Sequence, residues 1–374
     1  MPLSLAGTTT ASLCVDIGVI HAFDSKARSD ICEVELELHS GNIECLFGLA
    51  SSLALDLPLS LEPASKAARG VRLISPSHAS PRHAENPELQ GDVSAAEALA
   101  SIIRACLRQI EGNVDGVLND EDPEWVHQMR IGTRRLRACL SLVHELAASD
   151  QLACLIAEVK WLACALGAVR DLDVLALETL PAITQASRGD AATSSLLRSF
   201  TAKVARRRRI ARSEARTALA SRRFVQLILA ASAFAATSAH APIQTPAREF
   251  ASRLLARRQR KLLRRAAALP NGSAAQRHAA RIAAKQLRYA TEFFASLFSG
   301  RRAHTYRKAL TRLQDVLGAL NDATVAACLA REICGADSSA AAALQRWAAA
   351  QSSLAADDLA KAWRDFSRCK PFWD

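Results

Sequence analysis

Basic side chains recur at helical spacing in two parts of the chain, and their types point most directly to chemistry. Residues 127–137 read H-Q-M-R-I-G-T-R-R-L-R, and residues 278–288 read H-A-A-R-I-A-A-K-Q-L-R. In an α-helix, spacings of three and four residues bring side chains onto one face. Each segment therefore predicts one row of cations. The first row is His127, Arg130, Arg134 and Arg137, and the second row is His278, Arg281, Lys285 and Arg288.

Such rows suit an anionic ligand. Like charges on one face destabilise a helix unless an anion or acidic side chains face them. The arginine fork binds phosphate oxygens with two hydrogen bonds. The chain has no G-x-x-x-x-G-K-[ST] loop, no G-x-G-x-x-G and no G-x-S-x-G, and no carboxylate pair at metal-ligand spacing accompanies the rows. We therefore predict phosphate binding without cleavage, with no catalytic residue, metal ligand or cofactor. A solvated basic face without a ligand is the alternative.

The charge distribution favours a polyanion as the ligand. The 374 residues carry a net charge of +11, but residues 1–90 are net acidic, and residues 201–312 hold 26 Lys and Arg against three Glu. A concentrated excess of this kind attracts polyanions. Beyond the two rows, the candidate ligand-binding residues in this basic region are Arg207, Arg208, Arg212, Arg257, Lys261, Arg264, Arg307 and Lys308.

The two rows belong to an internal repeat with an offset of 151 residues. The pattern L-G-A-x-x-D-x-x-V at 166–174 recurs at 317–325 with the same offset. Two matching blocks at one offset predict a tandem duplication of a helical unit. The repeated acids, Asp171 and Asp322, are expected to hold an arginine of a basic row from a neighbouring helix. The two histidines are either satisfied polar residues or donors to a phosphate.

Helices are the elements that must position these rows. Half of the residues are apolar, only 5% are aromatic, and Gly and Pro are scarce. That composition favours helices over a mainly β fold. Ser94 with Glu97 predicts a capping box, and Asp122 before Pro123 predicts a helix start. Helix breaks are expected near residues 119, 149, 181–190, 241–246, 270–273, 300 and 335.

The N-terminal residues have a different pattern. Glutamates alternate with apolar residues over Ile31–His39, which predicts a half-buried strand with a carboxylate face. Helical spacing follows over Ile43–Leu55, and residues 57–73 are expected to be extended or turn structure. We predict a mainly α fold. Its parts are a small α+β fragment at 1–75, a linker at 76–92 and a helical domain at 93–374, with repeats at about 93–240 and 245–374.

Cysteine spacing and hydropathy bear on location. The ten cysteines form no C-x-x-C and lie at no zinc-finger spacing, which favours reduced thiols in a cytoplasmic protein. The most apolar run, residues 224–239, is too short to span a bilayer and predicts a buried helix. No membrane partner is expected, and the sequence leaves the oligomeric state open.

Residues 92–370 resemble the CHAD domain, a helical domain named for its histidines. The segments that carry the resemblance are V-H-Q-M-R-I-G-T-R-R-L-R at 126–137, L-G-A-V-R-D-L-D-V-L at 166–175, K-Q-L-R-Y-A-T-E-F at 285–293 and L-Q-D-V-L-G-A-L-N-D at 313–322. The resemblance implies two four-helix bundles related by a pseudo-two-fold axis. It also implies that a basic groove or pore between them binds inorganic polyphosphate without catalysis, at polyphosphate granules.

The N-terminal fragment resembles the C-terminal half of a CYTH domain, the triphosphate-tunnel fold. The carriers are I-C-E-V-E-L-E-L-H-S-G at 31–41 and L-E-P-A-S-K-A-A-R-G-V-R-L at 61–73. The resemblance implies metal-side carboxylates among Glu33, Glu35 and Glu37, and phosphate contacts at Lys66 and Arg69. Residues 1–30 lack the E-x-E-x-K strand of that family. We therefore expect a remnant that packs as a small hairpin with helices, without hydrolysis.

Two other functions stay open. Nucleic acid is a polyanion too, although Tyr289 is the one aromatic residue beside a row and stacking platforms for bases are scarce. Residual metal-dependent triphosphatase activity of the N-terminal fragment is the second alternative.

Overall fold

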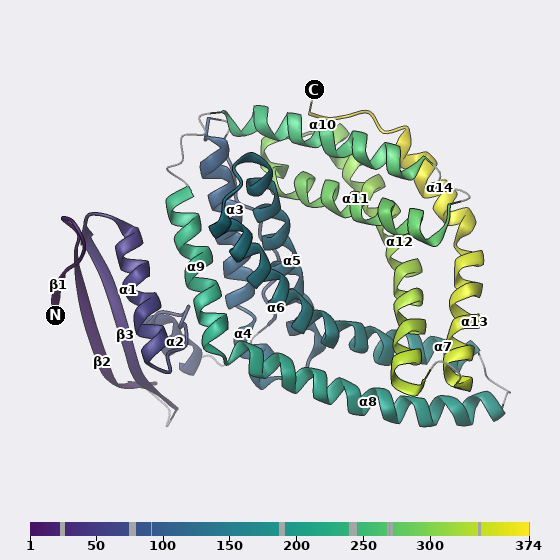
Figure 1. Ribbon diagram of the computed structural model, residues 1–374, viewed down its shortest axis with the longest axis horizontal. Coiled ribbons are helices and arrows are strands. Elements are labelled where there is room, and N and C mark those ends of the chain that lie inside the picture. The colour runs from purple at the N-terminus through teal and green to yellow at the C-terminus, as the bar shows by residue number, and fades with distance from the viewer. Residues whose placement is uncertain are drawn as a thin grey trace. The chain divides into compact units, whose positions relative to one another are not determined.

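The computed structural model describes residues 1–22, 27–74, 80–90, 92–186, 191–238, 245–267, 269, 272–335 and 338–373. They group into two compact units, each built from segments that are distant in the sequence (Figure 1). The first unit contains Met1–Glu85, Leu99–Ala163 and Arg216–Pro242, and the second contains Asn86–Ala98, Cys164–Ala215 and Ile243–Asp374.

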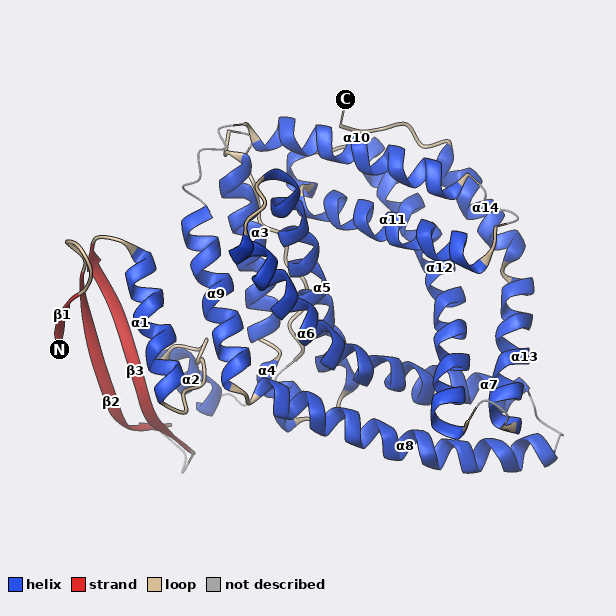
Figure 2. Cartoon of the chain, in the orientation of Figure 1, coloured by secondary structure: helices blue, strands red, loops and turns tan. Residues whose placement is uncertain are grey.

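Most of the described chain is helical, and the strands are confined to its N-terminal part (Figure 2). This agrees with the predicted mainly α fold with a small N-terminal α+β fragment. The elements of the predicted first repeat are α3 (Ala95–Glu111), α4 (Val114–Asn119), α5 (Pro123–Leu146), α6 (Asp150–Val174), the π-helical turn η1 (Leu175–Thr179), α7 (Leu180–Ala186), α8 (Ala191–Leu219) and α9 (Arg222–Ser238). Those of the second are α10 (Ala247–Ala266), α11 (Ala274–Phe293), the 3-10 turn η3 (Ala295–Leu297), α12 (Arg301–Cys334), α13 (Ser339–Leu354) and α14 (Ala356–Ser367).

The N-terminal fragment is a three-stranded antiparallel sheet with two helices. Its strands are β1 (Pro2–Ser4), β2 (Thr10–His21) and β3 (Arg28–Ser40), in the order β1-β2-β3. Helix α1 (Ile43–Asp56) follows as predicted, with its N-terminus capped by the side chain of Asn42. The expectation of extended or turn structure over residues 57–73 is wrong in its second half, because Lys66–Ile74 forms helix α2.

Strand pairing explains why α2 is a helix. The register sets Asp16 opposite Glu33 and Cys14 opposite Glu35, so these carboxylates share one face of the sheet. Spacing of three residues on a helix brings Lys66 and Arg69 onto one face, and both bind these carboxylates. The carboxylate face is thus covered by a basic helix, which local propensity alone does not reveal.

The repeat predicted from the sequence recurs in the helix boundaries. Helices α5 and α11 begin at Pro123 and Ala274, and α6 and α12 begin at Asp150 and Arg301, so both pairs are 151 residues apart. The N-caps of α5 and α11 correspond in the same way. Asp122 Oδ1 accepts from the backbone of Glu124 at 2.8 Å, as predicted, and Ser273 forms a capping box.

The starts of the two repeats are joined by reciprocal hydrogen bonds. The N–H of Ala95 donates to the carbonyl of Thr245 at 2.9 Å, and the N–H of Ala247 donates to the carbonyl of Val93 at 2.8 Å. All four residues belong to the second unit. Beside them the predicted capping box is present, since Ser94 and Glu97 hydrogen-bond each other's backbone. Together the backbone bonds at Ala95 and Ala247 form an isolated antiparallel bridge between Ser94 and Pro246.

The predicted helix breaks agree with the structure except at Pro181. Gly300 caps α12 at its start and Gly335 at its end, with φ values of +105° and +89° that favour glycine. Near Pro181 the chain stays helical as far as Ala186, because proline is tolerated in the first turn of α7, directly after η1. Parts of the expected breaks at 181–190, 241–246 and 270–273 lie outside the described residues, namely residues 187–190, 241–244 and 270–271.

Among the residues that the structure describes, one helical run, Asp150–Ala186, is long and apolar enough to cross a membrane by length and composition. A second candidate arises only if the bent pair Ser195–Leu219 and Arg222–Ser238 counts as one span. Core helices of globular domains meet the same criteria, so these runs are weak evidence for a membrane. The apolar run at 224–239 falls mainly on α9, which buries Phe224, Leu227 and Ile228 as predicted.

Gly116 allows α4 to pack against α5. A Cβ atom on Gly116 would lie 1.9 Å from Trp125 Cδ2, whereas nothing lies within 4 Å of one on Gly48 in α1. We expect Gly116→Ala to lower the free energy of unfolding by about 1–3 kcal/mol through overpacking. Gly48→Ala is the matched control and should raise it by about 0.5–1 kcal/mol, because alanine favours a helix interior. Denaturant unfolding of the full chain measures both, and equal effects of the two variants would contradict the packing.

Candidate functional site

The first row lies along α5 with an apolar stripe buried behind it. Met129 and Leu136 are at most 1% exposed, whereas His127, Arg130 and Arg134 are partly exposed and Arg137 is exposed. The row therefore shares one helix face, as its spacing predicted. Burial of the apolar stripe fixes the rotation of α5, and that rotation presents the cations.

The second row has the same arrangement on α11. Ala284 and Leu287 are buried, His278 is exposed, and the other three members are partly exposed. An acidic side chain follows the last cation of this row at i+4. Arg288 Nε lies 3.4 Å from Glu292 Oε1, one helical turn later. This acid has no counterpart in the first row, where the equivalent position is Ser141, whose hydroxyl donates to the Arg137 carbonyl.

The candidate arginines on α8 differ in their surroundings. Arg207 is exposed and lies 3.7 Å from Glu214. Arg208 Nε donates to Asp173 Oδ1 at 2.5 Å, and the Asp173 side chain is fully buried. Arg212 is 3% exposed. Of these three, Arg207 is the one whose charge is open to an external polyanion, whereas Arg212 has little surface to offer one.

A half-open pocket lies beside Arg207 within the second unit. It has a volume of about 860 Å³ and lies between α6, α8 and α12. Its basic lining residues are Lys203, Arg206 and Arg207, and its apolar lining includes Leu172 and Leu329. Lys203 and Arg206 were not among the candidates, although they lie in the same basic run. Their exposure is set by the rotation of α8, which sequence reasoning did not resolve.

Lys261 on α10 is tied to the helix of the second row. Its Nζ and the Nη1 of Arg258 both donate to Gln286 Oε1 at 3.2 Å, and Gln286 is on α11. Arg258 is 6% exposed and was missed by sequence reasoning. Among the remaining candidates, Arg257, Arg264 and Lys308 are exposed and Arg307 is partly exposed.

An acid that the sequence did not single out holds an arginine of α8. Asp173 binds Arg208, and both residues belong to the second unit. Asp322 is exposed, and its carboxylate accepts a hydrogen bond from the neighbouring Asn321 amide at 3.4 Å. The repeat places Thr324 at the position of Asp173, and the Thr324 hydroxyl donates to the Leu320 carbonyl. The buried ion pair is therefore a feature of one repeat alone.

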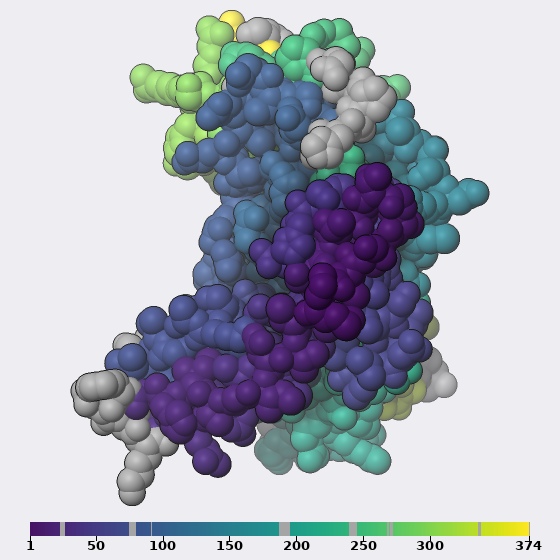
Figure 3. All heavy atoms as spheres, turned by 90° about the vertical axis from the view of Figure 1, so that its left-hand side faces the viewer, coloured from purple at the N-terminus to yellow at the C-terminus, as the bar shows by residue number. Residues whose placement is uncertain are grey.

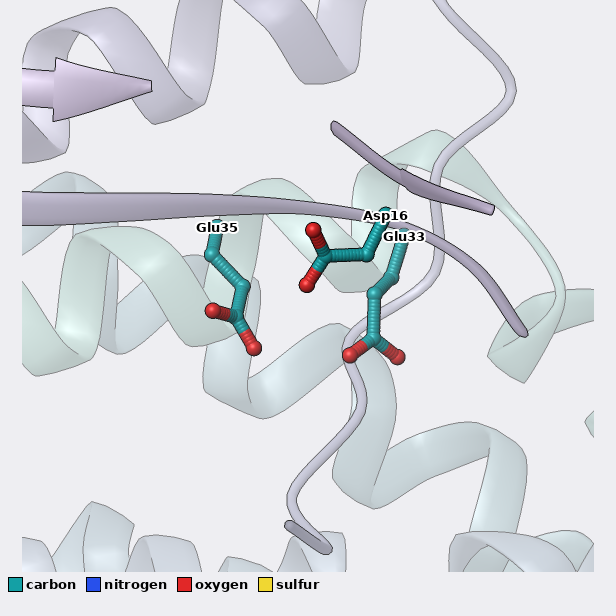
Figure 4. A group of neighbouring side chains, drawn as sticks. All are labelled: Asp16, Glu33 and Glu35. Carbon is teal, nitrogen blue, oxygen red and sulfur yellow. The ribbon is translucent and has the colours of Figure 1, made fainter. Parts of the chain in front are cut away.

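Three carboxylates of the N-terminal fragment meet at a separate site in the first unit (Figure 4). The carboxylate oxygens of Asp16, Glu33 and Glu35 lie within 4.8 Å of one another. Lys66 Nζ lies 2.6, 2.7 and 2.5 Å from these three side chains in turn, and Arg69 binds Glu33 as well. The expected residues Glu33, Glu35, Lys66 and Arg69 are thus together. Asp16 was missed because its place depends on strand register.

The basic side chains favour the ionised form of Glu33. The hydrogen bond from Lys66 lowers the pKa of Glu33 below its usual 4.5, with a further contribution from Arg69 against the effect of burial. The carboxylates in turn raise the pKa of Lys66, Asp16 most strongly. Three carboxylates are donors of the kind that divalent cations prefer. However, the ammonium group of Lys66 already lies where all three converge, so a cation would have to compete with it.

Comparison with known proteins assigns the chain to a protein family. The family model of the CHAD domain matches residues 101–331. The chain belongs to the CHAD family. The crystal structure of the CHAD domain from the plant Ricinus communis is similar with a TM-score of 0.70 and 34% sequence identity, over 79% of this chain and 98% of that one. PptA from Streptomyces chartreusis has a TM-score of 0.54 and 21% identity, over 74% and 99%. A search of the curated proteins finds no match.

The matched CHAD span contains both rows and every other candidate ligand-binding residue on α8, α10 and α12. The carboxylate site lies outside it, at residues 16–69. The CHAD assignment thus covers the basic helices and leaves the N-terminal fragment unassigned.

Loss of the Asp173 carboxylate should destabilise this CHAD domain. Asp173→Ala leaves Arg208, which is 25% exposed, without its ion-pair partner. We expect the free energy of unfolding to fall by about 1–3 kcal/mol. This is less than the loss expected when a fully buried ion pair is broken, because the Arg208 side chain reaches solvent. Glu214→Ala is the control on the exposed pair with Arg207, with an expected change of about 0–1 kcal/mol. Denaturant unfolding distinguishes them, and an unchanged Asp173→Ala variant would refute a stabilising role.

The lowered pKa of Glu33 predicts acid sensitivity. Its stabilisation is fully present above the usual pKa of 4.5 and is lost as pH falls through the lower pKa of the folded state. We therefore expect the stability difference between the wild type and Glu33→Gln to shrink on acidification below about pH 4.5. Glu37→Gln, which alters an exposed carboxylate of the same strand, is the control. Thermal melting of the full chain as a function of pH measures this, and a difference that stays constant into strong acid would contradict it.

Proposed function

We propose that this CHAD protein binds inorganic polyphosphate through its two basic rows and does not cleave it. The observation that carries the proposal is that two helices of a duplicated CHAD domain each present a row of cations in front of a buried apolar stripe. Polyphosphate is a linear chain of anionic oxygens, and arginine binds such oxygens with paired, charge-assisted hydrogen bonds. Binding in the cytoplasm at polyphosphate granules follows from this proposal.

Several features favour binding over turnover. The sequence holds no nucleophile motif and no phosphate-cradling loop. Within the described residues, one group of carboxylates resembles a metal site: Asp16, Glu33 and Glu35. Lys66 bridges all three, and the group lies outside the CHAD span. A site composed mainly of arginine and lysine side chains donates hydrogen bonds to phosphate oxygens, which positions phosphate.

Polyphosphate is favoured over nucleic acid as the ligand because of the aromatic residues. Single-stranded nucleic acids are bound through bases stacked on exposed aromatic rings. Tyr289 is 6% exposed, with its ring stacked on Phe293 at a centroid distance of 6.2 Å. On the first row's helix, Trp125 is 4% exposed. These rings are used for packing, so the exposed chemistry of the row helices is cationic and suits a ligand that is all phosphate.

The row arginines should dominate polyphosphate affinity. We expect the variant with Arg130, Arg134, Arg281 and Arg288 changed to Ala to bind at least about 100-fold more weakly, since hydrogen bonds to charged groups contribute about 1.5 kcal/mol or more each. The control changes the exposed Arg301, Arg302, Arg331 and Arg346 to Ala and removes the same formal charge. Titration with polyphosphate of defined length measures both, with helicity checked by circular dichroism.

Three experimental outcomes would contradict the proposed function. Equal weakening of the row variant and its control would show attraction by net charge instead of a site. Displacement of polyphosphate by RNA at equal phosphate concentration would favour nucleic-acid binding. Phosphate release from tripolyphosphate with a divalent cation, lost in Glu33→Ala or Glu35→Ala, would favour the triphosphatase alternative.

A further inference from the structure

Strand β2 exposes a line of branched apolar side chains. Val15, Ile17 and Val19 are 59%, 81% and 43% exposed. They alternate with Asp16 and therefore point away from the carboxylate face that α2 covers. The N-terminal strands lie at the surface that faces the viewer in Figure 3. Scattered exposed apolar residues are ordinary on a protein surface, but three successive ones on one side of a strand are not.

The same three residues present unpaired backbone groups at the edge of the sheet. Strand β1 pairs with β2 only over Thr10–Ser12. The ladder ends where the Leu13 N–H donates to the Met1 carbonyl at 2.9 Å and the Met1 amino group donates to the Leu13 carbonyl at 2.7 Å. Because edge-facing backbone groups recur every second residue, those of Val15, Ile17 and Val19 point to this same edge. Within the described part of the chain, no strand pairs with the edge beyond Leu13.

This edge lacks the usual protection against pairing. Natural edge strands are commonly blocked by lysine, proline or a bulge. Strand β2 contains neither lysine nor proline, and its one register shift lies at Thr10/Ala11, away from the open stretch. Seven residues, Cys14–Ile20, are thus open to an added strand.

The open stretch is complementary to itself. In an antiparallel arrangement centred on Ile17, Ile17 faces Ile17, Val15 faces Val19 and Cys14 faces Ile20. The acid Asp16 then faces Gly18, so the only charged side chain of the stretch does not meet its own copy. A centre on Asp16 would oppose two carboxylates, which is unfavourable. In the pairing centred on Ile17, the residues whose N–H and C=O groups point to the edge lie opposite one another, so these groups can hydrogen-bond between the two copies.

We propose that β2 pairs with β2 of a second copy of this chain, in an antiparallel ladder centred on Ile17. The two three-stranded sheets then form one continuous sheet. The ladder covers Cys14–Ile20. The register sets His21 of the second copy opposite Leu13, so Met1 gives up its two hydrogen bonds to Leu13 when the copies pair. The interface does not depend on the proposed polyphosphate binding, and it lies outside the CHAD span.

The test measures the mass of the full chain in solution and changes the residue at the centre of the ladder. We expect a concentration-dependent dimer for the wild type. Ile17→Lys sets two lysines opposite each other and should raise the dimer dissociation constant more than about tenfold, as should Ile17→Glu. An equal mixture of the two variants should regain dimers that contain one copy of each, because only a ladder centred on residue 17 brings them together. Native mass spectrometry resolves that composition.

A matched control and a second measurement keep the test decisive. Leu354→Lys makes the same change at a 74% exposed leucine on α13 and should leave the dimer intact. In hydrogen exchange, the amides of Val15, Ile17 and Val19 should gain protection with concentration in the wild type but not in Ile17→Lys. A wild type that stays monomeric, an Ile17→Lys variant that still dimerises, or a mixture without mixed dimers would overturn the proposal.

Discussion

The two row helices, α5 and α11, each carry several cations on one face, and these cations repel one another. Burial of apolar side chains on the opposite face keeps each helix in place. Repulsion along a row of cations disfavours its helix by a few tenths of a kcal/mol per neighbouring pair. Burial of one leucine or methionine contributes about 1.5–3 kcal/mol, which is several times larger. Met129 and Leu136 in α5, and Leu287 in α11, provide this burial. The rows can therefore remain at least partly exposed on their helices.

The same constraint separates cations that serve the fold from those that remain open to a ligand. Arg208 is held by the buried Asp173, and Arg258 and Lys261 are held by Gln286. Arg207, Arg257 and Arg264 stay exposed on the same helices. In the N-terminal fragment the sign is reversed, since a cluster of carboxylates is neutralised by Lys66 and Arg69. Side-chain partners and exposure therefore differ among the cations of a single basic helix.

Local and repeated features of this chain could be predicted from its sequence. Spacing placed both rows on single helix faces, and Ser94 and Asp122 marked helix starts that the structure confirms. The offset of 151 residues recurs in the starts of α5 and α11. These signals succeed because they depend on neighbours within one or two helical turns, or on identity between two copies.

Features that depend on tertiary partners could not be predicted. Asp16 joins the carboxylates only through the register of β2 with β3. The burial of Arg212 and Arg258 follows from how their helices rotate against others, which a uniformly basic run does not specify. The contacts of Lys66 and Arg69 with the sheet likewise depend on how α2 packs, although their spacing of three residues is a local helical signal. The sequence shows how many charged side chains each helix carries, and tertiary packing determines which of them stay accessible to solvent.

Calorimetric titration of polyphosphate at a series of salt concentrations tests the central claim most directly. If the exposed rows bind phosphate by displacing counterions, the logarithm of the binding constant will fall linearly and steeply with the logarithm of salt concentration. The row variant will lose most of that slope because it has lost four of the contacting charges. Binding that is absent at low salt, or that is insensitive to salt in the wild type, would contradict the account.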